Sequence, residues 1–168
     1  MKFAICGALA TAASLVLFVQ PALAVVSATD RNFVQMAGAA GLAEVADAQL
    51  ALNKEPTESV KMVAGHMLND HTLANQKLAA LAHRLNVPVP NAPDPADRQA
   101  MDAQRPLDGT RFMSQYLRDQ QAAHEQAITL FKHEIAEGSN PQLVAFAKAT
   151  LPTLEKHLKM VRDAAKGM

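Results

Sequence analysis

The sequence predicts an all-α protein built as a four-helix bundle. The chain is rich in alanine, leucine, methionine, glutamine, glutamate and lysine, which favour helices. Its apolar residues recur with helical spacing in four segments, and its glycines and prolines gather in clusters between those segments. A length of 168 residues suffices for one domain with its own core and is short for two.

The N-terminus, residues 1–24, has the pattern of a secretory signal peptide. Lys2 supplies a positive charge, an apolar stretch follows, and Ala22-Leu23-Ala24 is a small-residue cleavage site. A retained membrane anchor is the alternative, although polar residues interrupt the apolar stretch. The only cysteine, Cys6, would leave with the signal, so residues 25–168 would contain no disulfide, thiolate metal site or c-type haem motif. We therefore expect a periplasmic or outer-envelope protein that does not span the membrane once the signal is removed.

The first helix is expected at residues 31–53 and the second at residues 56–86. Asp30 is suited to cap the first helix. Pro56 suits the first turn of the second, where its missing N–H costs no hydrogen bond.

The third helix is expected at residues 109–137 and the fourth at residues 141–165. Gly138 ends the third helix, and Asn140-Pro141 combines a cap with a proline at the first helical position. Between the second and third helices lies VPVPNAPDPADRQAMDAQRPLDG, which is too proline-rich for a continuous helix. Its roughly 22 residues can span ~70 Å, against ~45 Å for a 30-residue helix. This connection can cross the whole bundle, as in ferritin-like folds, and a plain up-down connection also remains open.

Each predicted helix places one polar residue on its apolar face. At 100° per residue, His71, His124 and His157 fall near the centre of the inward arcs of the second, third and fourth helices. Glu44 lies on the inward arc of the first. The other three histidines project outward: His66, His83 and His133.

Buried polar groups of this kind need partners, because an isolated buried charge is costly. One metal ion would satisfy Glu44, His71, His124 and His157 together, and imidazoles with a carboxylate suit zinc, iron, copper or manganese. Asp70, Gln120 and Tyr116 are candidates to support these ligands. The alternative is that the same residues only form hydrogen bonds with each other.

Other sites and partners are less favoured by the sequence. His66 and Asp70, four residues apart, could form an adventitious surface metal site. An exported protein with several methionines could bind copper(I), but most of these fall on the apolar arcs and fit core positions better: Met36, Met62, Met67, Met113 and Met160. No basic stripe or aromatic platform suggests nucleic acid, since the chain balances 16 basic against 16 acidic residues and lacks tryptophan.

Four segments together resemble bacterial exported proteins grouped as domain of unknown function 4142 (DUF4142), often described as outer membrane proteins. These segments are FVQMAGAAGLAEVADAQLAL, MLNDHTLANQKLAALA, HEQAITLFKHEI and FAKATLPTLEKHL, within residues 31–164. The resemblance implies a ferritin-like four-helix bundle in the bacterial envelope, with no established activity. The family's recurring polar positions match Glu44, Asp70, His71, His124 and His157. Where the family often has an acid before the second histidine, this chain has Ala123.

The sequence does not support the di-iron chemistry of ferritins. Those sites need a Glu-x-x-His motif on each of two helices. Here Leu68, Gln121 and Leu154 stand three residues before the inward histidines. We therefore predict no catalytic residues, and two functions remain: an envelope protein binding a single transition-metal ion, or a structural or interaction protein without metal. An oxidoreductase at the same site would need an open coordination position. The oligomeric state cannot be predicted.

Overall fold

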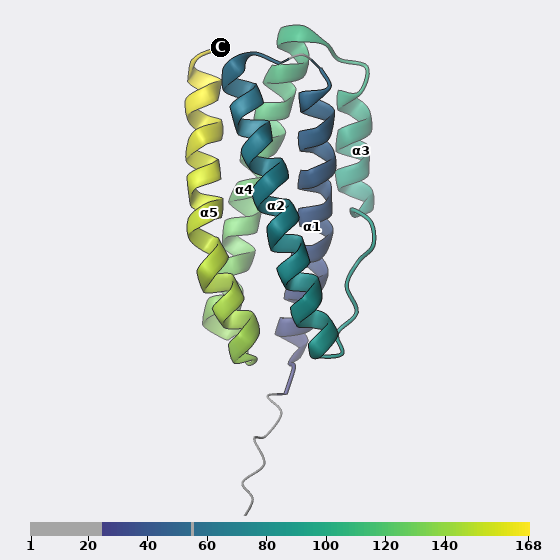
Figure 1. Ribbon diagram of the computed structural model, residues 1–168, viewed down its shortest axis with the longest axis vertical. Coiled ribbons are helices and arrows are strands. Elements are labelled where there is room, and N and C mark those ends of the chain that lie inside the picture. The colour runs from purple at the N-terminus through teal and green to yellow at the C-terminus, as the bar shows by residue number, and fades with distance from the viewer. Residues whose placement is uncertain (1–24, 55) are drawn as a thin grey trace, which may run out of the picture.

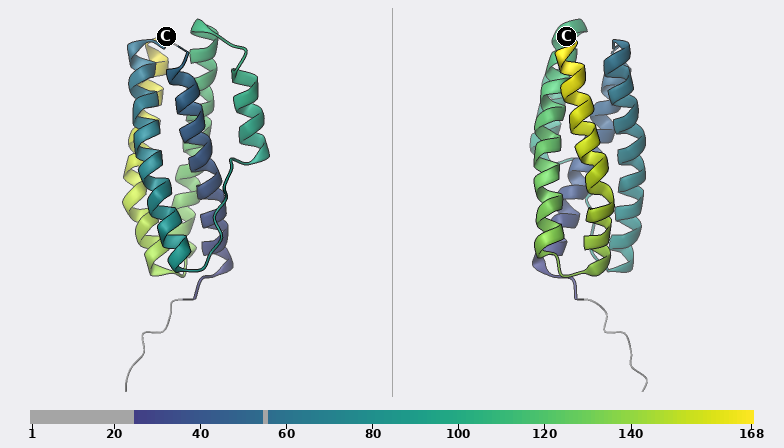
Figure 2. Two further views of the ribbon diagram at one scale, coloured as in Figure 1. Left: turned by 45° about the vertical axis from the view of Figure 1, so that its right-hand side comes forward. Right: turned by 90° about the vertical axis from the view of Figure 1, so that its left-hand side faces the viewer.

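The computed structural model describes residues 25–54 and 56–168, and within them the chain forms five α-helices and no strand. They are α1 (Ala28–Leu52), α2 (Glu58–Arg84), α3 (Pro95–Gln104), α4 (Gly109–Glu137) and α5 (Pro141–Lys166). The four long helices lie side by side as a bundle, and the short α3 lies on its flank (Figures 1 and 2). The predicted signal peptide falls outside the described residues.

The long connection after α2 crosses the bundle from one end to the other. In Figure 1, α1 and α5 run upward, α2 and α4 run downward, and the connection climbs the full height between α2 and α4. Each of α1 and α5 packs against both α2 and α4. Of the two arrangements left open by the sequence, the chain adopts the crossover.

The crossing segment contains a helix that the sequence analysis did not include. Asp94 caps α3, because its side chain accepts a hydrogen bond from the backbone N–H of Asp97, and Pro95 occupies the first turn. The segment before α3 passes so close to α1 that a Cβ on Gly38 would lie 2.9 Å from Pro90. The prolines therefore break the segment without preventing a short helix packed against α1 and α4.

The start of α1 differs from the prediction in one respect. Its N-cap is Ser27, and Asp30 is the third helical residue of a capping box with that serine. The Asp30 carboxylate also accepts hydrogen bonds from the backbone N–H groups of Ser139 and Asn140, at 3.0 and 3.1 Å. Asp30 thus ties the start of α1 to the turn between α4 and α5.

The start of α2 differs from the sequence prediction, and the start of α5 agrees with it. Pro56 precedes the N-cap Thr57 and so lies outside α2, whereas we expected it in the first turn. Asn140 and Pro141 have the expected roles at α5, because the Asn140 side chain accepts from two backbone N–H groups of the first turn.

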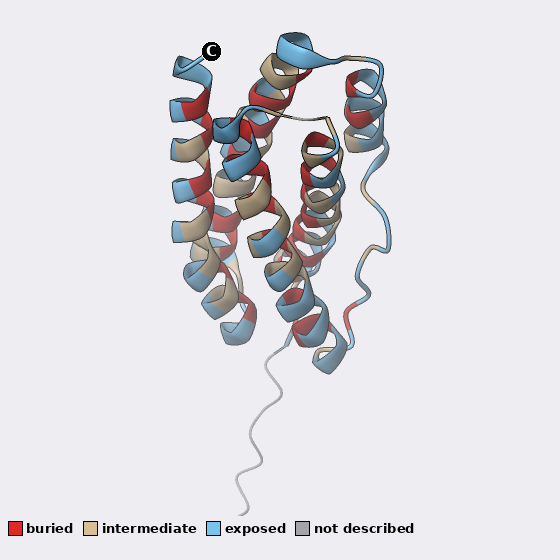
Figure 3. Cartoon of the chain, turned by 45° about the horizontal axis from the view of Figure 1, so that its top comes forward, coloured by how far each residue is buried: buried red, intermediate tan, exposed pale blue. Residues whose placement is uncertain are grey.

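Buried residues form stripes along the inner faces of the long helices (Figure 3). They make two apolar clusters. One includes Phe33, Leu78 and Phe131, and the other includes Met67, Phe112 and Val161. The inward histidines and Glu44 come between members of the two clusters on every long helix, so a polar layer divides the apolar core. No helix in the described part of the chain combines the length and apolar character needed to cross a bilayer.

Candidate metal centre

Three histidines from three helices meet in the polar layer. His71 from α2, His124 from α4 and His157 from α5 are 8%, 1% and 0% exposed. One ring nitrogen of each lies within 4.8 Å of the others. The apolar residues on both sides of each histidine set this arrangement, because they turn the same face of the helix inward.

The nitrogen separations match the requirement of a single ion. His124 Nε2 is central, lying 3.4 Å from His71 Nε2 and 3.4 Å from His157 Nδ1. Two nitrogens bound at ~2.0 to 2.1 Å to one tetrahedral ion are about 3.4 Å apart. The two separations are therefore those of ligands that share a metal.

The hydrogen bonds on the far sides of two rings fix which nitrogens are free. His124 Nδ1 lies 2.9 Å from the backbone carbonyl oxygen of Gln120, which can only accept, so Nδ1 carries the hydrogen. His157 Nε2 lies 2.9 Å from Asp70 Oδ2 and carries its hydrogen for the same reason. A neutral imidazole has one N–H, so His124 Nε2 and His157 Nδ1 turn lone pairs toward each other. Lone pairs cannot form a hydrogen bond, and this is the arrangement of histidines that bind a metal.

The three imidazoles are held in the neutral form that binds metals. Burial lowers the pKa of His71 well below its ordinary value, and the neighbouring His124 and His157 lower it further. Burial also lowers the pKa of His124 to about 4. For His157, burial lowers the pKa and the hydrogen bond to Asp70 opposes that shift.

Glu44, the fourth residue predicted to bind the ion, lies behind His124. Its Oε1 is 3.7 Å from His124 Nδ1, the nitrogen that faces away from the other two histidines. Within the described residues, the group whose ligand atoms converge consists of the three histidines alone. Helical periodicity placed Glu44 on the inner face of α1, but it could not say which side of His124 the carboxylate would occupy.

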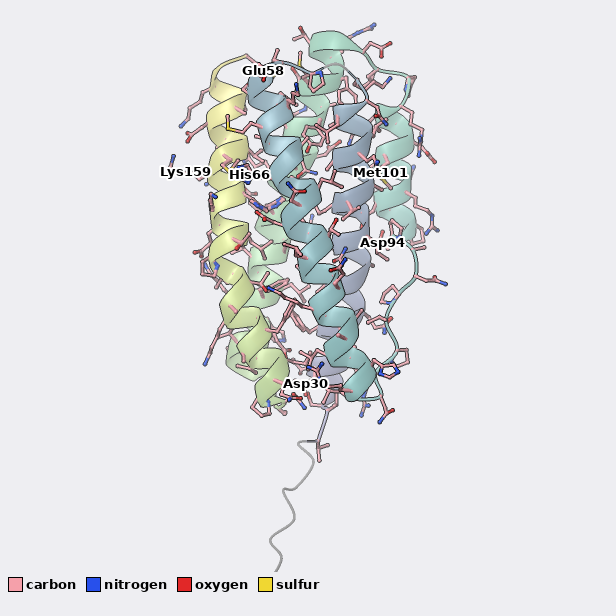
Figure 4. The ribbon with its side chains drawn as sticks, in the orientation of Figure 1. Asp30, Glu58, His66, Asp94, Met101 and Lys159 are labelled. Carbon is pink, nitrogen blue, oxygen red and sulfur yellow. The ribbon has the colours of Figure 1, made fainter. Side chains whose placement is uncertain are left out.

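Asp70 and Gln120 both contact the histidines. Asp70 is bonded to His157 on the neighbouring helix, and its Oδ2 is also 3.9 Å from Nδ1 of His66, which lies beside α5 in Figure 4. Gln120 accepts from His124 through its backbone, while its side-chain amide donates to Asp47. Tyr116 is fully buried, and its hydroxyl has no hydrogen-bond partner among the described residues.

The remaining histidines and methionines are placed as follows. The side chain of His66 is 42% exposed, and His83 and His133 are exposed, so all three face outward as expected. Met67 is buried. Met36 and Met62 are 51% and 59% exposed, so these two are the methionines that do not belong to the core.

Sequence analysis missed an acidic group next to the histidines. Asp47 is 6% exposed and lies one turn after Glu44 on α1. Burial raises the pKa of each carboxyl to about 7, and for Asp47 the hydrogen bond from Gln120 opposes that shift. The spacing of three residues between two acids was the available signal, because it places both on one helical face.

Comparisons with known proteins identify the family. The family described as "Domain of unknown function (DUF4142)" matches residues 19–164. The chain belongs to this family. The crystal structure of a DUF305 fragment from Deinococcus radiodurans is similar, with a TM-score of 0.76 and 13% sequence identity, over 85% of this chain and 99% of that chain. At this identity the likeness shows the fold alone. No curated protein matches the chain.

Proposed function

We propose that this chain is an exported envelope protein with a ferritin-like bundle that binds one transition-metal ion through His71, His124 and His157. The observation that carries the proposal is the pair of lone pairs, on His124 Nε2 and His157 Nδ1, that face each other at 3.4 Å. Their other ring nitrogens are occupied by a backbone carbonyl and a carboxylate. This is the outer hydrogen-bond pattern that orients histidine ligands.

The three imidazole nitrogens favour first-row transition metals. Neutral imidazoles suit zinc, copper, iron and manganese, and ligand type alone does not choose among them. Three protein nitrogens leave at least one coordination position for water or another donor. We assign Glu44 to the neighbouring acidic group, because its carboxylate lies against the outer nitrogen of His124. Metal handling or protection against metal stress would use such a site without catalysis.

The location proposed for the protein rests on the pattern of residues 1–24, with its charged start, apolar stretch and cleavage site. The ferritin-like assignment is supported by the single crossover connection between the second and third long helices. A structural or interaction protein without metal is the competing function, and its histidines would have to share a proton across 3.4 Å.

Metal content of the purified mature protein tests the proposal. The protein is loaded separately with Zn²⁺, Cu²⁺, Fe²⁺ and Mn²⁺, desalted and subjected to elemental analysis. We expect about one equivalent of at least one metal, falling below about a tenth of an equivalent in His124→Ala. His133→Ala, a change on the exposed face of the same helix, is the matched control and should retain the metal.

Circular dichroism of each variant shows whether the bundle remains folded. A wild-type protein that retains less than about a tenth of an equivalent of every metal would refute the proposal. So would a folded His124→Ala variant that keeps its full metal content.

A further inference from the structure

A cavity of about 330 Å³ lies against the histidine cluster, with residues of all five helices in its wall, and His71 and His124 line it. Much of its wall is apolar and rich in alanine. Met101 and Asp94 mark the part contributed by α3 and the segment before it (Figure 4). Where α1, α3 and α4 face one another, its polar lining includes Glu44, Asp47, Gln104, Asp119 and Gln120.

The carboxylates of this polar lining have no lysine or arginine partner, and the basic group next to Glu44 is the ring of His124, 3.7 Å away. Glu44 and Asp47 are 7% and 6% exposed, and no lysine or arginine is among the described residues that line the cavity. Buried charges are normally paired or bound to a metal. The two acids therefore need a cation or protons from outside the fold.

Two buried glutamines provide an independent indication of a ligand. Gln120 Nε2 donates to Asp47 Oδ2 at 3.1 Å, and Gln104 Nε2 donates to Asp119 Oδ2 at 3.0 Å. Ionised carboxylates only accept, so when Asp47 and Asp119 are ionised each glutamine turns its NH₂ group toward the acid and its carbonyl oxygen away. Those two carbonyl oxygens have no hydrogen-bond partner among the described residues, although Gln104 and Gln120 are only 1% and 2% exposed.

The unpartnered atoms around the cavity are all oxygens that accept. Besides the two glutamine carbonyls, Glu44 Oε2 and Asp47 Oδ1 are buried without a hydrogen-bond partner in the described chain. Buried polar atoms are rarely left in this state unless an ion or water completes them. The four residues that carry these atoms come from α1, α3 and α4, and all of them line the same cavity.

We propose that this cavity binds a hard divalent cation, of the class of Ca²⁺ and Mg²⁺, through Glu44, Asp47 and the carbonyl oxygens of Gln104 and Gln120. Carboxylates, amide carbonyls and water are the ligands that such cations prefer. The cavity exceeds the volume of a bare ion, and at ~30 Å³ per water it accommodates part of the hydration shell. The site is chemically distinct from the histidine cluster, which offers nitrogen.

The chain contains a built-in reporter for this site. Tyr116 is its only tyrosine, tryptophan is absent, and Tyr116 lies one turn before Gln120 on α4. The tyrosine is fully buried, with its hydroxyl unpartnered in the described structure. Terbium is a luminescent hard cation that binds oxygen ligands, and a nearby excited tyrosine sensitises its emission.

Terbium titration with excitation of tyrosine tests the proposal. We expect saturable terbium emission from the wild-type protein, which Ca²⁺ or Mg²⁺ lowers by displacing the terbium. Asp47→Asn should lower the emission by about tenfold or more, because it removes one of the charges that bind the cation. Asp102→Asn, which changes an exposed acid on α3, should leave the emission unchanged.

His157→Ala separates this site from the histidine site, because His71 and His124 line the cavity and His157 does not. That variant should lose the transition metal and keep the terbium emission. Absence of sensitised emission from the wild-type protein would overturn the cation site. Undiminished emission from folded Asp47→Asn would also overturn it, whatever happens at the histidines.

Discussion

The histidine cluster and the oxygen-lined cavity are neighbours in one polar layer, but they leave opposite kinds of atom free. In the cluster, acceptors on the outer side hold the N–H groups, so nitrogen lone pairs face inward. In the cavity, carboxylates hold the amide N–H groups, so carbonyl oxygens remain. Gln120 serves both, since its backbone orients His124 and its side chain donates to Asp47. The comparison shows that outer hydrogen bonds decide which metal class each site suits.

The two regions also respond to pH in opposite directions. Histidines with lowered pKa values bind fewer protons when folded, so the free energy of unfolding of the metal-free protein falls as pH drops from about 6.5 toward 4. Glu44 and Asp47 have pKa values raised to about 7, so they bind more protons when folded. Their contribution to the free energy of unfolding rises as pH drops below about 7.

The largest effect should come from His124, whose Nε2 lies 3.4 Å from both other ligand nitrogens. We expect His124→Ala to weaken transition-metal affinity by more than about 100-fold, beyond the range seen for residues that only support ligands. Competition with a chromogenic chelator measures the affinity. If His124→Ala binds within tenfold of His133→Ala, the nitrogens of this cluster do not hold the ion.

A smaller loss should follow from removing the carboxylate behind His157. Asp70→Ala leaves the ring free to rotate and to change which nitrogen is protonated, so we expect metal affinity to fall about 10- to 100-fold. Asn69→Ala, an exposed change at the preceding position, serves as the control. Equal affinities for the two variants in the same chelator competition would show that Asp70 does not orient the ligand.

Replacing Asp47 should change the melting temperature by an amount that depends on pH. In the metal-free protein at pH 8 the buried carboxylate is ionised and destabilising. Asp47→Asn should therefore raise the melting temperature by about 5 °C, since each tenfold change in the proton affinity of a carboxyl group corresponds to ~1.4 kcal/mol. At pH 5 the wild-type group is largely protonated, and the difference should fall below about 1 °C. Thermal unfolding in a chelator at both values measures this. An equal change in melting temperature at pH 5 and pH 8 would contradict the raised pKa.

The smallest effect should come from His66, whose side chain is 42% exposed and 3.9 Å from Asp70. A surface pair of this kind contributes up to about 1 kcal/mol, so His66→Ala should weaken metal affinity by less than about fivefold. Calorimetric titration with the same metal measures the change. A loss as large as that of His124→Ala would instead favour the surface pair of His66 and Asp70 as the binding site.

Sequence periodicity accounts for the inward histidines, because apolar residues on both sides of His71, His124 and His157 specify the inner face of each helix. It could not give the partner of Asp70. That residue lies at the edge of the inner face of α2, and only the crossover topology places α2 beside α5.

The oxygen-lined cavity was harder to predict from the sequence than the histidine cluster. Asp94-Pro95 starts α3 with the same cap and proline pattern as Asn140-Pro141, which the sequence analysis did recognise. The surrounding prolines concealed this short helix. Without it, nothing indicated that Gln104 is buried against α4.

Diffraction from crystals of the metal-loaded protein, with data collected on both sides of the metal's absorption edge, tests the central claim most directly. We predict one anomalous peak ~2.0 to 2.1 Å from His71 Nε2, His124 Nε2 and His157 Nδ1. A loaded crystal with no peak among these nitrogens, or with its peak at His66 and Asp70, would contradict the account.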